Sequence, residues 1–379
     1  MRFACLLGNG LSIAFNAELS VQNLTSWLGE SFRAQEALAR FAREAGTPAD
    51  NFERLLGPLD RVARSLPHLE KLREVAGEAH TPELVAALQV VADFASRVHD
   101  AGLGTVLGRV AEQGAAVESP EFALTIQQVC DALKQLNGRP VTVATLNYDA
   151  LIPAAFIRLE GGDPWGGQAP ADMADLGDGR EHSSCIPIPD ESLQTLELRA
   201  FADFPLGRKI LLLNLHGSLS WLHDPSTGRM HKVKSLGALR DMDYWSKLRD
   251  GTALCRPLVV LTDQKDEVIS QAPFNVAYDA FQQRLIKAQR WLIGGYGLGD
   301  TPVNTVLHDA MSAKRRLAQA AGTSPTLPRV LVVDKDCQVD ERRRRIAELL
   351  DLPMANIDVE PAGFPDAVTG TAWAAWAQG

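Results

Sequence analysis

The sequence predicts an α/β protein with a doubly wound, mostly parallel Rossmann-like sheet and a large helical insertion after the first strand. Short apolar runs recur along the 379 residues, and helical patterns follow most of them. The runs are continuous rather than alternating, which indicates strands buried on both faces of a parallel sheet. Alternation of strands and helices is typical of an open, doubly wound sheet.

Seven apolar runs are expected to form buried strands. In chain order they are FACLLG (3–8), PVTVATL (140–146), KILLLNL (209–215), PLVVLT (257–262), RWLIGGY (290–296), RVLVVD (329–334) and ANIDVEP (355–361). Helical patterns cover 277–289 and 301–320. A hairpin is expected over 218–233, turning at Pro225–Gly228.

The first two strands are separated by a long segment without a convincing strand. Its apolar residues recur at three- and four-residue spacing, which predicts a helical insertion over 20–136. We therefore expect one Rossmann-like domain formed by 1–19 and 137–379. The insertion carries large apolar residues that form either an oligomer surface or an internal core: Trp27, Phe32, Phe41 and Leu55. A second irregular stretch, 160–208, is rich in Gly, Asp and Pro and is expected to be a long loop region.

Composition narrows the class of protein. The net charge of −9 argues against a basic nucleic-acid-binding surface, so we expect no direct nucleic-acid contact. Four arginines at 342–345 are expected to form a solvated helix face, with a partner or phosphate contact as the alternative. No apolar run reaches the roughly 18 residues of a membrane-spanning helix, and no secretory signal is recognisable. The five cysteines contain no CxxC pair, so no cysteine zinc site is expected and the compartment is expected to be the cytoplasm.

LLGNGLSIAFN (6–16) is the first candidate binding motif. It joins a predicted strand to a predicted helix, where a dinucleotide-binding turn belongs. Gly8 and Gly10 fit the usual G-x-G-x-x-G fingerprint, but Ile13 occupies the third glycine position. The glycines would let backbone N–H groups approach a pyrophosphate, and Ser12 could add a hydroxyl contact or cap the helix. The alternative is a tight strand-to-helix turn that binds no ligand.

Two further motifs place polar side chains at strand ends. In ATLNYDA (144–150), Asn147 and Asp149 follow a strand, where an open sheet binds its ligands. Their structural alternatives are a turn former and a helix N-cap. In NLHGSLSWL (214–222), His216 follows the next apolar strand. It suits a general base near neutral pH, although a lone strand-end histidine is often only structural.

The last two motifs follow the strands near the C-terminus. IGGYGLGDTPVN (293–304) contains a glycine-rich turn, and Asp300 then begins a helix as its N-cap, with proline in the first turn. Ligand contact and plain turn chemistry are equally compatible with this pattern. Asp334 ends the strand of LVVDKD and could bind the two hydroxyls of a ribose, or simply start a helix.

The order of these motifs along the chain resembles the sirtuin-like superfamily. The segments GNGLS, TLNYD, LHGSL and GYGLGD look closest to the bacterial branch of sirtuin-like NAD hydrolases found in antiphage defence. The resemblance covers 6–16, 140–150, 209–222 and 255–335, and leaves out most of the helical insertion. The chain lacks the four-cysteine zinc module, the longer first motif and the peptide-gripping strand of deacylating sirtuins, which points away from protein deacylation.

The resemblance implies that NAD lies across the strand ends as a substrate and that no metal is needed. Asn147 would order the nicotinamide ribose or the attacking water, Asp149 would support that arrangement, and His216 would be the general base. The implied binding residues lie at three further strand ends: Gly8, Asn9, Gly10 and Ser12 for the pyrophosphate and adjacent ribose, Gly295, Tyr296, Leu298 and Asp300 for the adenosine-side turn, and Asp334 for the adenosine ribose.

The activity implied by the resemblance is an NAD+ glycohydrolase that releases nicotinamide and ADP-ribose as an antiphage effector. Such an enzyme needs control, which we expect from homo-oligomer assembly or from a partner such as a HerA-like hexameric ATPase. The main alternative is a non-catalytic NAD- or ADP-ribose-binding regulatory subunit of such a complex. A zinc-free deacylase and an ordinary oxidoreductase are weaker alternatives. The sequence leaves open linear or cyclic ADP-ribose as product, and NAD or NADP as substrate, although Asp334 would repel a 2′-phosphate.

Overall fold

The computed structural model describes most of the chain. The described residues are 1–31, 40, 44, 51–62, 65, 82–137, 140–165, 170–177, 186–188, 191–193, 195–198, 207–241, 243–261 and 265–378. Phe32 and Phe41, two of the apolar residues considered for an oligomer surface, lie outside them. None of the helices among the described residues is both long enough and apolar enough to span a bilayer.

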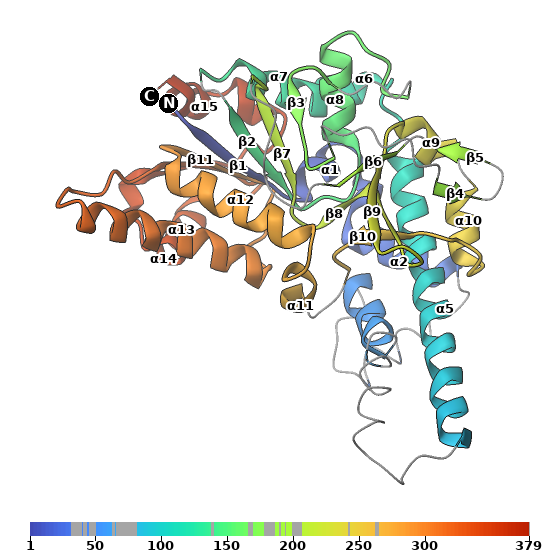
Figure 1. The fold of residues 1–379 in the computed structure, drawn as a ribbon. Coiled ribbons are helices and arrows are strands. Elements are labelled where there is room, and N and C mark those ends of the chain that lie inside the picture. Colours follow the sequence, from blue (N-terminus) through green and yellow to red (C-terminus); the bar gives the residue numbers. More distant parts are fainter. Residues whose placement is uncertain are drawn as a thin grey trace.

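A parallel sheet of seven strands forms the centre of the structure (Figure 1). Its strands are β1 (Phe3–Leu7), β2 (Val141–Thr145), β3 (Met173–Ala174), β7 (Ile210–Asn214), β11 (Arg290–Gly294), β12 (Arg329–Val333) and β13 (Ile357–Glu360). Their spatial order is β13-β12-β11-β1-β2-β7-β3, and every pairing is parallel. The predicted Rossmann-like α/β class is therefore confirmed.

The order of the strands shows where the ligand-binding edge of this sheet lies. From β1 the chain builds one side of the sheet through β2 and β7, and it then returns to the other side of β1 through β11, β12 and β13. The turns after β1 and β11 consequently lie side by side at the point where the winding direction reverses. Ligands of open α/β sheets bind at this reversal, outside the carboxyl ends of the strands.

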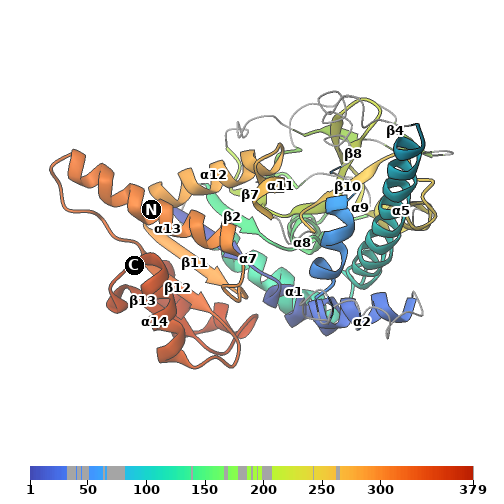
Figure 2. The ribbon, with the colours of Figure 1, turned by 90° about the horizontal axis from the view of Figure 1, so that it is seen from below.

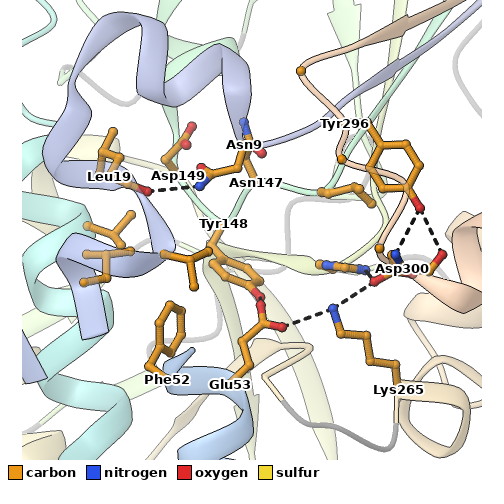
Figure 3. Close-up of a pocket in the computed structure, with 18 residues that line it drawn as sticks. Asn9, Leu19, Phe52, Glu53, Asn147, Tyr148, Asp149, Lys265, Tyr296 and Asp300 are labelled. Carbon is orange, nitrogen blue, oxygen red and sulfur yellow. Dashed lines mark hydrogen bonds and ion pairs between the residues drawn. The ribbon is translucent and has the colours of Figure 1, made fainter. Parts of the chain in front are cut away.

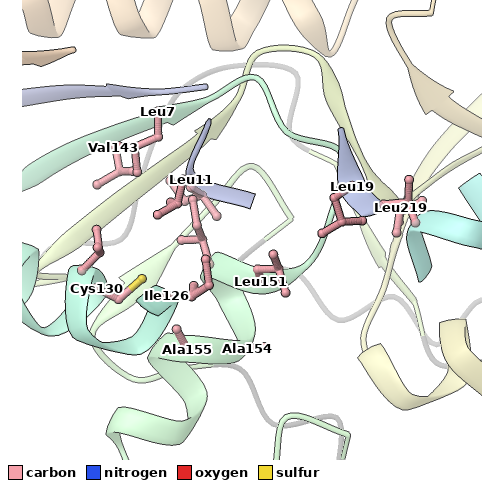
Figure 4. Packing of buried hydrophobic residues seen from close by; sticks show 14 of the residues in the cluster. Leu7, Leu11, Leu19, Ile126, Cys130, Val143, Leu151, Ala154, Ala155 and Leu219 are labelled. Atoms are coloured by element: carbon pink, nitrogen blue, oxygen red, sulfur yellow. The ribbon is translucent and has the colours of Figure 1, made fainter. Parts of the chain in front are cut away.

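The two faces of the sheet are covered by different helices (Figures 1 and 2). In β1 the side chains alternate: Phe3, Cys5 and Leu7 join one core, and Ala4 and Leu6 join the other. The second core is completed by α12 (Phe274–Lys287), α13 (Thr301–Ala320) and α14 (Val339–Leu350). The first is completed by α7 (Gln128–Gln135), α8 (Leu151–Leu159) and α15 (Thr371–Gln378), and Figure 4 shows its packing.

Helices fill the described part of the connection between β1 and β2. They are α1 (Gly10–Phe15), α2 (Val21–Ser31), a helical stretch over 52–62, α5 (Pro82–Gln113), α6 (Pro120–Phe122), a π-helical segment (Ala123–Gln127) and α7. No strand occurs in the described stretches of 8–140. Leu24, Phe52 and Leu103 from these helices belong to the first of the two cores, which also contains Phe3, Cys5 and Leu7 of β1. Leu55 is also buried, whereas Trp27 keeps 37% exposure beneath the guanidinium of Arg109.

A smaller antiparallel sheet packs beside the carboxyl edge of the large one. Its strands are β6 (Thr195–Glu197), β8 (Gly217–Asp224), β9 (Arg229–Val233) and β10 (Arg256–Val259), in the order β10-β8-β9-β6. The expected hairpin is β8–β9, paired up to Asp224 and Arg229. Two short helices, α9 (Leu236–Asp241) and α10 (Tyr244–Arg249), lead from it to β10.

Two sequence predictions need correction here. The run 257–262 was expected in the parallel sheet, but β10 pairs antiparallel with β8. An apolar run indicates burial and not the identity of its partner strand, which depends on the connection. The stretch 160–208 is also not only a loop region, because β3 pairs parallel with β7 and forms the edge of the large sheet. A separate two-stranded hairpin, β4 (Ile186–Ile188) and β5 (Glu191–Leu193), lies in the same stretch.

Candidate functional site

A cavity of about 240 Å³ opens at the carboxyl edge of the large sheet (Figure 3). It is bordered by the chain segments that follow β1, β2, β7 and β11, and by the helical region after β1. Seven of the residues singled out from the sequence line it: Asn9, Asn147, Asp149, His216, Gly295, Tyr296 and Asp300. Gly8, Gly10, Ser12, Leu298 and Asp334 do not. Tertiary structure therefore brings four separate sequence motifs to one cavity.

The turn after β1 packs directly against the turn after β11. The N–H groups of Gly8 and Gly10 donate to the carbonyl oxygens of Gly294 and Gly295, at 2.9 and 3.0 Å. A Cβ atom on Gly8 would lie 2.5 Å from the oxygen of Gly295, so no larger residue fits without a backbone shift. The N–H groups of these two glycines are therefore engaged by backbone. Pyrophosphate binding by this turn stays a prediction, and Asn9 is its residue that lines the cavity.

Ser12 links the two polar residues that follow β2. Its hydroxyl donates to Oδ2 of Asp149 at 2.5 Å and accepts from Nδ2 of Asn147 at 2.7 Å. Oδ1 of Asn147 is buried and has no hydrogen-bond partner among the described residues. A buried carbonyl oxygen without a donor is costly unless a ligand or water supplies one. Asn147 therefore has its amide orientation set by Ser12 and one acceptor left over.

Asp149 forms a hydrogen bond to the start of α8 and also lines the cavity. Oδ1 accepts from the N–H of Leu151 at 3.1 Å, at the start of α8, while Oδ2 takes the Ser12 hydroxyl. Burial raises the pKa of this carboxyl above its ordinary value, and the bonds from Ser12 and Leu151 counteract only part of that shift. Asp149 thus anchors Ser12 and α8 together at the end of β2.

His216 is held in place by the small sheet. It lies between β7 and β8, and its carbonyl oxygen accepts from the N–H of Val260 at 2.9 Å. Gly217 has a φ of +81°, and a Cβ there would lie 2.0 Å from the oxygen of Leu258. Only glycine tolerates both the left-handed backbone and this contact. The ring of Tyr148 stacks on the imidazole with centroids 6.4 Å apart and an interplanar angle of 26°.

A partly buried chain of charges forms the other wall of the cavity (Figure 3). Nζ of Lys265, at the start of α11 (Lys265–Ile269), lies 2.8 Å from Oδ2 of Asp300 and 3.1 Å from Oε2 of Glu53. The same Oδ2 of Asp300 lies 3.3 Å from Nε2 of His216. Burial alone would raise the pKa of Asp300. The neighbouring groups His216 and Lys265 together outweigh burial and hold that pKa well below its ordinary value.

The glycine-rich turn after β11 is organised by Tyr296. Its hydroxyl lies 2.9 Å from both the carbonyl oxygen of Asp300 and Oδ1 of Asn304. Arg342, the first of the four consecutive arginines, is buried; it donates to the carbonyl oxygen of Tyr296 and pairs with Asp334 at 2.8 Å. This corrects the expectation of a solvated face for Arg342. Asp334 therefore supports the turn from outside the cavity, and its contact with a ribose stays a prediction.

Three residues with polar side chains line the cavity and were given no role by the sequence. The hydroxyl of Tyr148 donates to Oε1 of Glu53 at 2.6 Å, and Lys265 bridges Glu53 to Asp300. Tyr148 stands within the TLNYD motif, so its position was a usable signal. Glu53 and Lys265 carry none, because each is an ordinary charged residue in a helical pattern. Among the described residues there is no group of three or more His, Cys, Asp or Glu side chains arranged to hold a metal ion.

Fold and cavity together define a class of protein: an open parallel sheet with a polar site at its topological switch point, a class that commonly binds nucleotides. A family model for the SIR2-like domain matches residues 141–349, more than half of the chain. The chain belongs to this family, as its motifs predicted. Membership indicates an NAD-related function in general. No curated protein matches the chain.

Proposed function

We propose that this protein is an NAD+ glycohydrolase, which cleaves NAD+ with water into nicotinamide and ADP-ribose. The observation that carries the proposal is the pairing of two groups at one cavity. Asn147 presents a buried amide oxygen without a partner among the described residues, and His216 lines the same cavity from the next strand end. A protein that only binds a nucleotide has no need of an oriented amide and a histidine at one place.

The chemistry needs few groups. In NAD+ the bond from C1′ of the ribose to nitrogen already carries a cationic leaving group. Its electron pair passes to the nicotinamide nitrogen as the bond breaks, so no general acid has to protonate the leaving group. The C1′ centre becomes oxocarbenium-like, as in glycoside hydrolysis. Water then bonds to C1′, and its proton passes to His216 as general base, while Oδ1 of Asn147 orients the water or a ribose hydroxyl.

Cavity size supports binding of one half of the dinucleotide inside. About 240 Å³ is below the roughly 300–1,000 Å³ of a site that encloses a drug-sized ligand. The nicotinamide riboside half would fill the cavity, and the pyrophosphate and adenosine would extend past Asn9 and the turn of Gly295 and Tyr296. Asp334, outside the cavity, would then be reached only by the adenosine end.

The test is nicotinamide release from NAD+, measured by chromatography for the wild type, Asn147→Ala and His216→Ala. We expect each substitution to reduce the rate on the order of 10²-fold or more, with NAD+ binding by calorimetry largely kept. His308→Ala is the matched control, since this histidine is exposed on α13, and it should release nicotinamide like the wild type. Equal rates in all four proteins would contradict the roles of Asn147 and His216.

The same samples separate the alternative function. Binding of NAD+ or ADP-ribose by the wild type without release of nicotinamide, also after addition of candidate partners, would favour a non-catalytic regulatory subunit. Absence of both binding and release would contradict the proposal that the cavity binds NAD+. Release that depends on an acylated lysine peptide would instead indicate a zinc-free deacylase.

The biological setting is proposed from the resemblance of the motifs. We propose an antiphage effector in the cytoplasm that depletes NAD+ when it is activated, assembled as a homo-oligomer or with a HerA-like hexameric ATPase. The catalytic domain would comprise 1–19 and 137–379, with 20–136 as the helical insertion. Light scattering on the purified protein would give the number of subunits, and a monomer at all concentrations would contradict self-assembly.

A further inference from the structure

We propose that Asp300 is a positioning residue for His216: it keeps the proton of the neutral imidazole on Nε2, so that Nδ1 is the nitrogen that accepts the proton from water. This inference rests on the proposed hydrolase function. It also changes the role given to Asp300 by the sequence, which placed it at the adenosine side of the site.

The geometry around Nε2 carries the inference. Nε2 of His216 is buried, lies 3.3 Å from Oδ2 of Asp300 and forms no hydrogen bond among the described residues. An ionised carboxylate only accepts hydrogen bonds and repels a lone pair, so hydrogen on Nε2 is the favoured tautomer of a neutral imidazole at this distance. Burial alone would raise the pKa of Asp300, but Lys265 is among the groups that hold it low, so the carboxylate is ionised at neutral pH. The lone pair then remains on Nδ1, which is the arrangement of an orienting Asp and a catalytic His.

Asp300 is fixed at both oxygens before any substrate binds. Oδ1 accepts from the N–H of Val303 at 3.1 Å as the N-cap of α13. Oδ2 accepts from Nζ of Lys265 at 2.8 Å, and Lys265 is held on its other side by Glu53. A carboxylate tied to a helix N-terminus and to a lysine cannot rotate away from the imidazole. Such supporting contacts are what keep a catalytic side chain in one orientation.

Among the described residues, the charged groups of this cavity wall come from three elements. Glu53 from the helical stretch 52–62 and Asp300 from the start of α13 are acidic, and Lys265 from α11 is basic. Three tyrosines surround them: Tyr148, Tyr278 and Tyr296. With a neutral imidazole the three charged groups sum to one negative charge. An imidazolium formed when Nδ1 accepts a proton would balance that charge.

The first experiment compares Asp300→Asn with the wild type in nicotinamide release. Asparagine can still cap α13 through its oxygen, but its amide would then present N–H to Nε2 and favour the opposite tautomer. We expect kcat to fall on the order of 10²-fold with KM little changed, and the acidic limb of the pH profile of kcat to move. Asp309→Asn is the control, because Asp309 forms an exposed pair with His308 on the same helix. It should leave kcat and the pH profile unchanged.

The second experiment reads the tautomer itself and needs no activity. Nitrogen-15 spectra of histidine-labelled protein, recorded where the imidazole is neutral, distinguish hydrogen on Nε2 from hydrogen on Nδ1. His216→Gln identifies the signal. We expect Nε2–H in the wild type and in Asp309→Asn, and Nδ1–H in Asp300→Asn.

The outcomes keep the two proposals apart. Nδ1–H in the wild type would overturn the inference, and this holds even if Asp300→Asn fails to fold. An unchanged kcat in folded Asp300→Asn would also overturn it, as would a raised KM with unchanged kcat, which would place Asp300 against the substrate. If the wild type releases no nicotinamide, also after addition of candidate partners, the proposed function fails, and the tautomer still decides whether Asp300 positions His216.

Discussion

Asp149 and Asp300 each lie between a strand of the large sheet and the next helix, but their pKa values shift in opposite directions. Each follows a strand of the large sheet, is nearly buried, and accepts an N–H from the start of the next helix at 3.1 Å. Yet the pKa of Asp149 is raised and that of Asp300 is lowered. The difference lies in their second oxygens: Asp149 faces a neutral hydroxyl, and Asp300 faces Lys265 and His216.

Similar burial therefore gives opposite pKa shifts when the neighbours differ: burial prevails at Asp149, and the charged neighbours prevail at Asp300. On the Ser12 side, the Asn147 amide donates to the Ser12 hydroxyl, and that hydroxyl donates to Asp149. Burial raises the pKa of the Asp149 carboxyl. On the Lys265 side, opposite charges stabilise one another in a poorly solvated place. In the reaction that we propose, one wall would hold the Asn147 amide still and the other would stabilise a cation on His216.

The largest expected effect comes from breaking the charged wall at its centre. Lys265→Met leaves the carboxylates of Glu53 and Asp300 without their shared cation. We expect the free energy of unfolding to fall by about 3 kcal/mol, near the lower end of the range for broken buried pairs, because the lysine side chain is still 19% exposed. Urea unfolding measures this. Lys287→Met, at an exposed position on α12, should change stability by at most about 0.5 kcal/mol; similar values for both variants would contradict a stabilising role of the charge chain.

A smaller effect is expected on the wall formed by Ser12, Asn147 and Asp149. Ser12→Ala removes the donor to Asp149 and the acceptor of the Asn147 amide, and it leaves two buried polar groups unpaired. The expected loss in unfolding free energy is about 2 kcal/mol. Ser324→Ala, at an exposed position, is the control and should be near neutral. A loss larger than that of Lys265→Met would reverse the ranking of the two walls.

The smallest expected effect is a difference in pH dependence. Because the pKa of Asp300 is lowered on folding, its contribution to stability is present above its unfolded pKa of about 3.9 and is lost as pH falls. The stability advantage of the wild type over Asp300→Asn should therefore shrink by about 1 kcal/mol between pH 5 and pH 3. For Asp149 the pKa is raised, so the wild type should gain relative to Asp149→Asn as pH falls from neutral. Urea unfolding across this pH range measures both, and slopes of the same sign would show that the two carboxyls do not differ.

Much of the fold was predictable because its signals are local. A continuous apolar run such as RWLIGGY is buried on both faces wherever it lies, and β11 is found there. The helix predicted over 301–320 coincides with α13, since Asp300 caps its first turn and Pro302 suits that turn. The run 257–262 was assigned to the wrong sheet, because its partner depends on a hairpin and two helices that precede it.

By itself, the sequence determined six of the seven strands of the large sheet, the family and the polar residues at the strand ends, because each depends on a short stretch of chain. Only the tertiary structure decided how those residues act. It turned the N–H groups of Gly8 and Gly10 toward a neighbouring turn, and it placed Asp300 beside His216. It also brought Glu53 and Lys265, which are far apart in the chain, into one chain of ion pairs with Asp300. Ion pairs between distant segments leave no periodic pattern in a sequence, because their geometry exists only after the segments have packed.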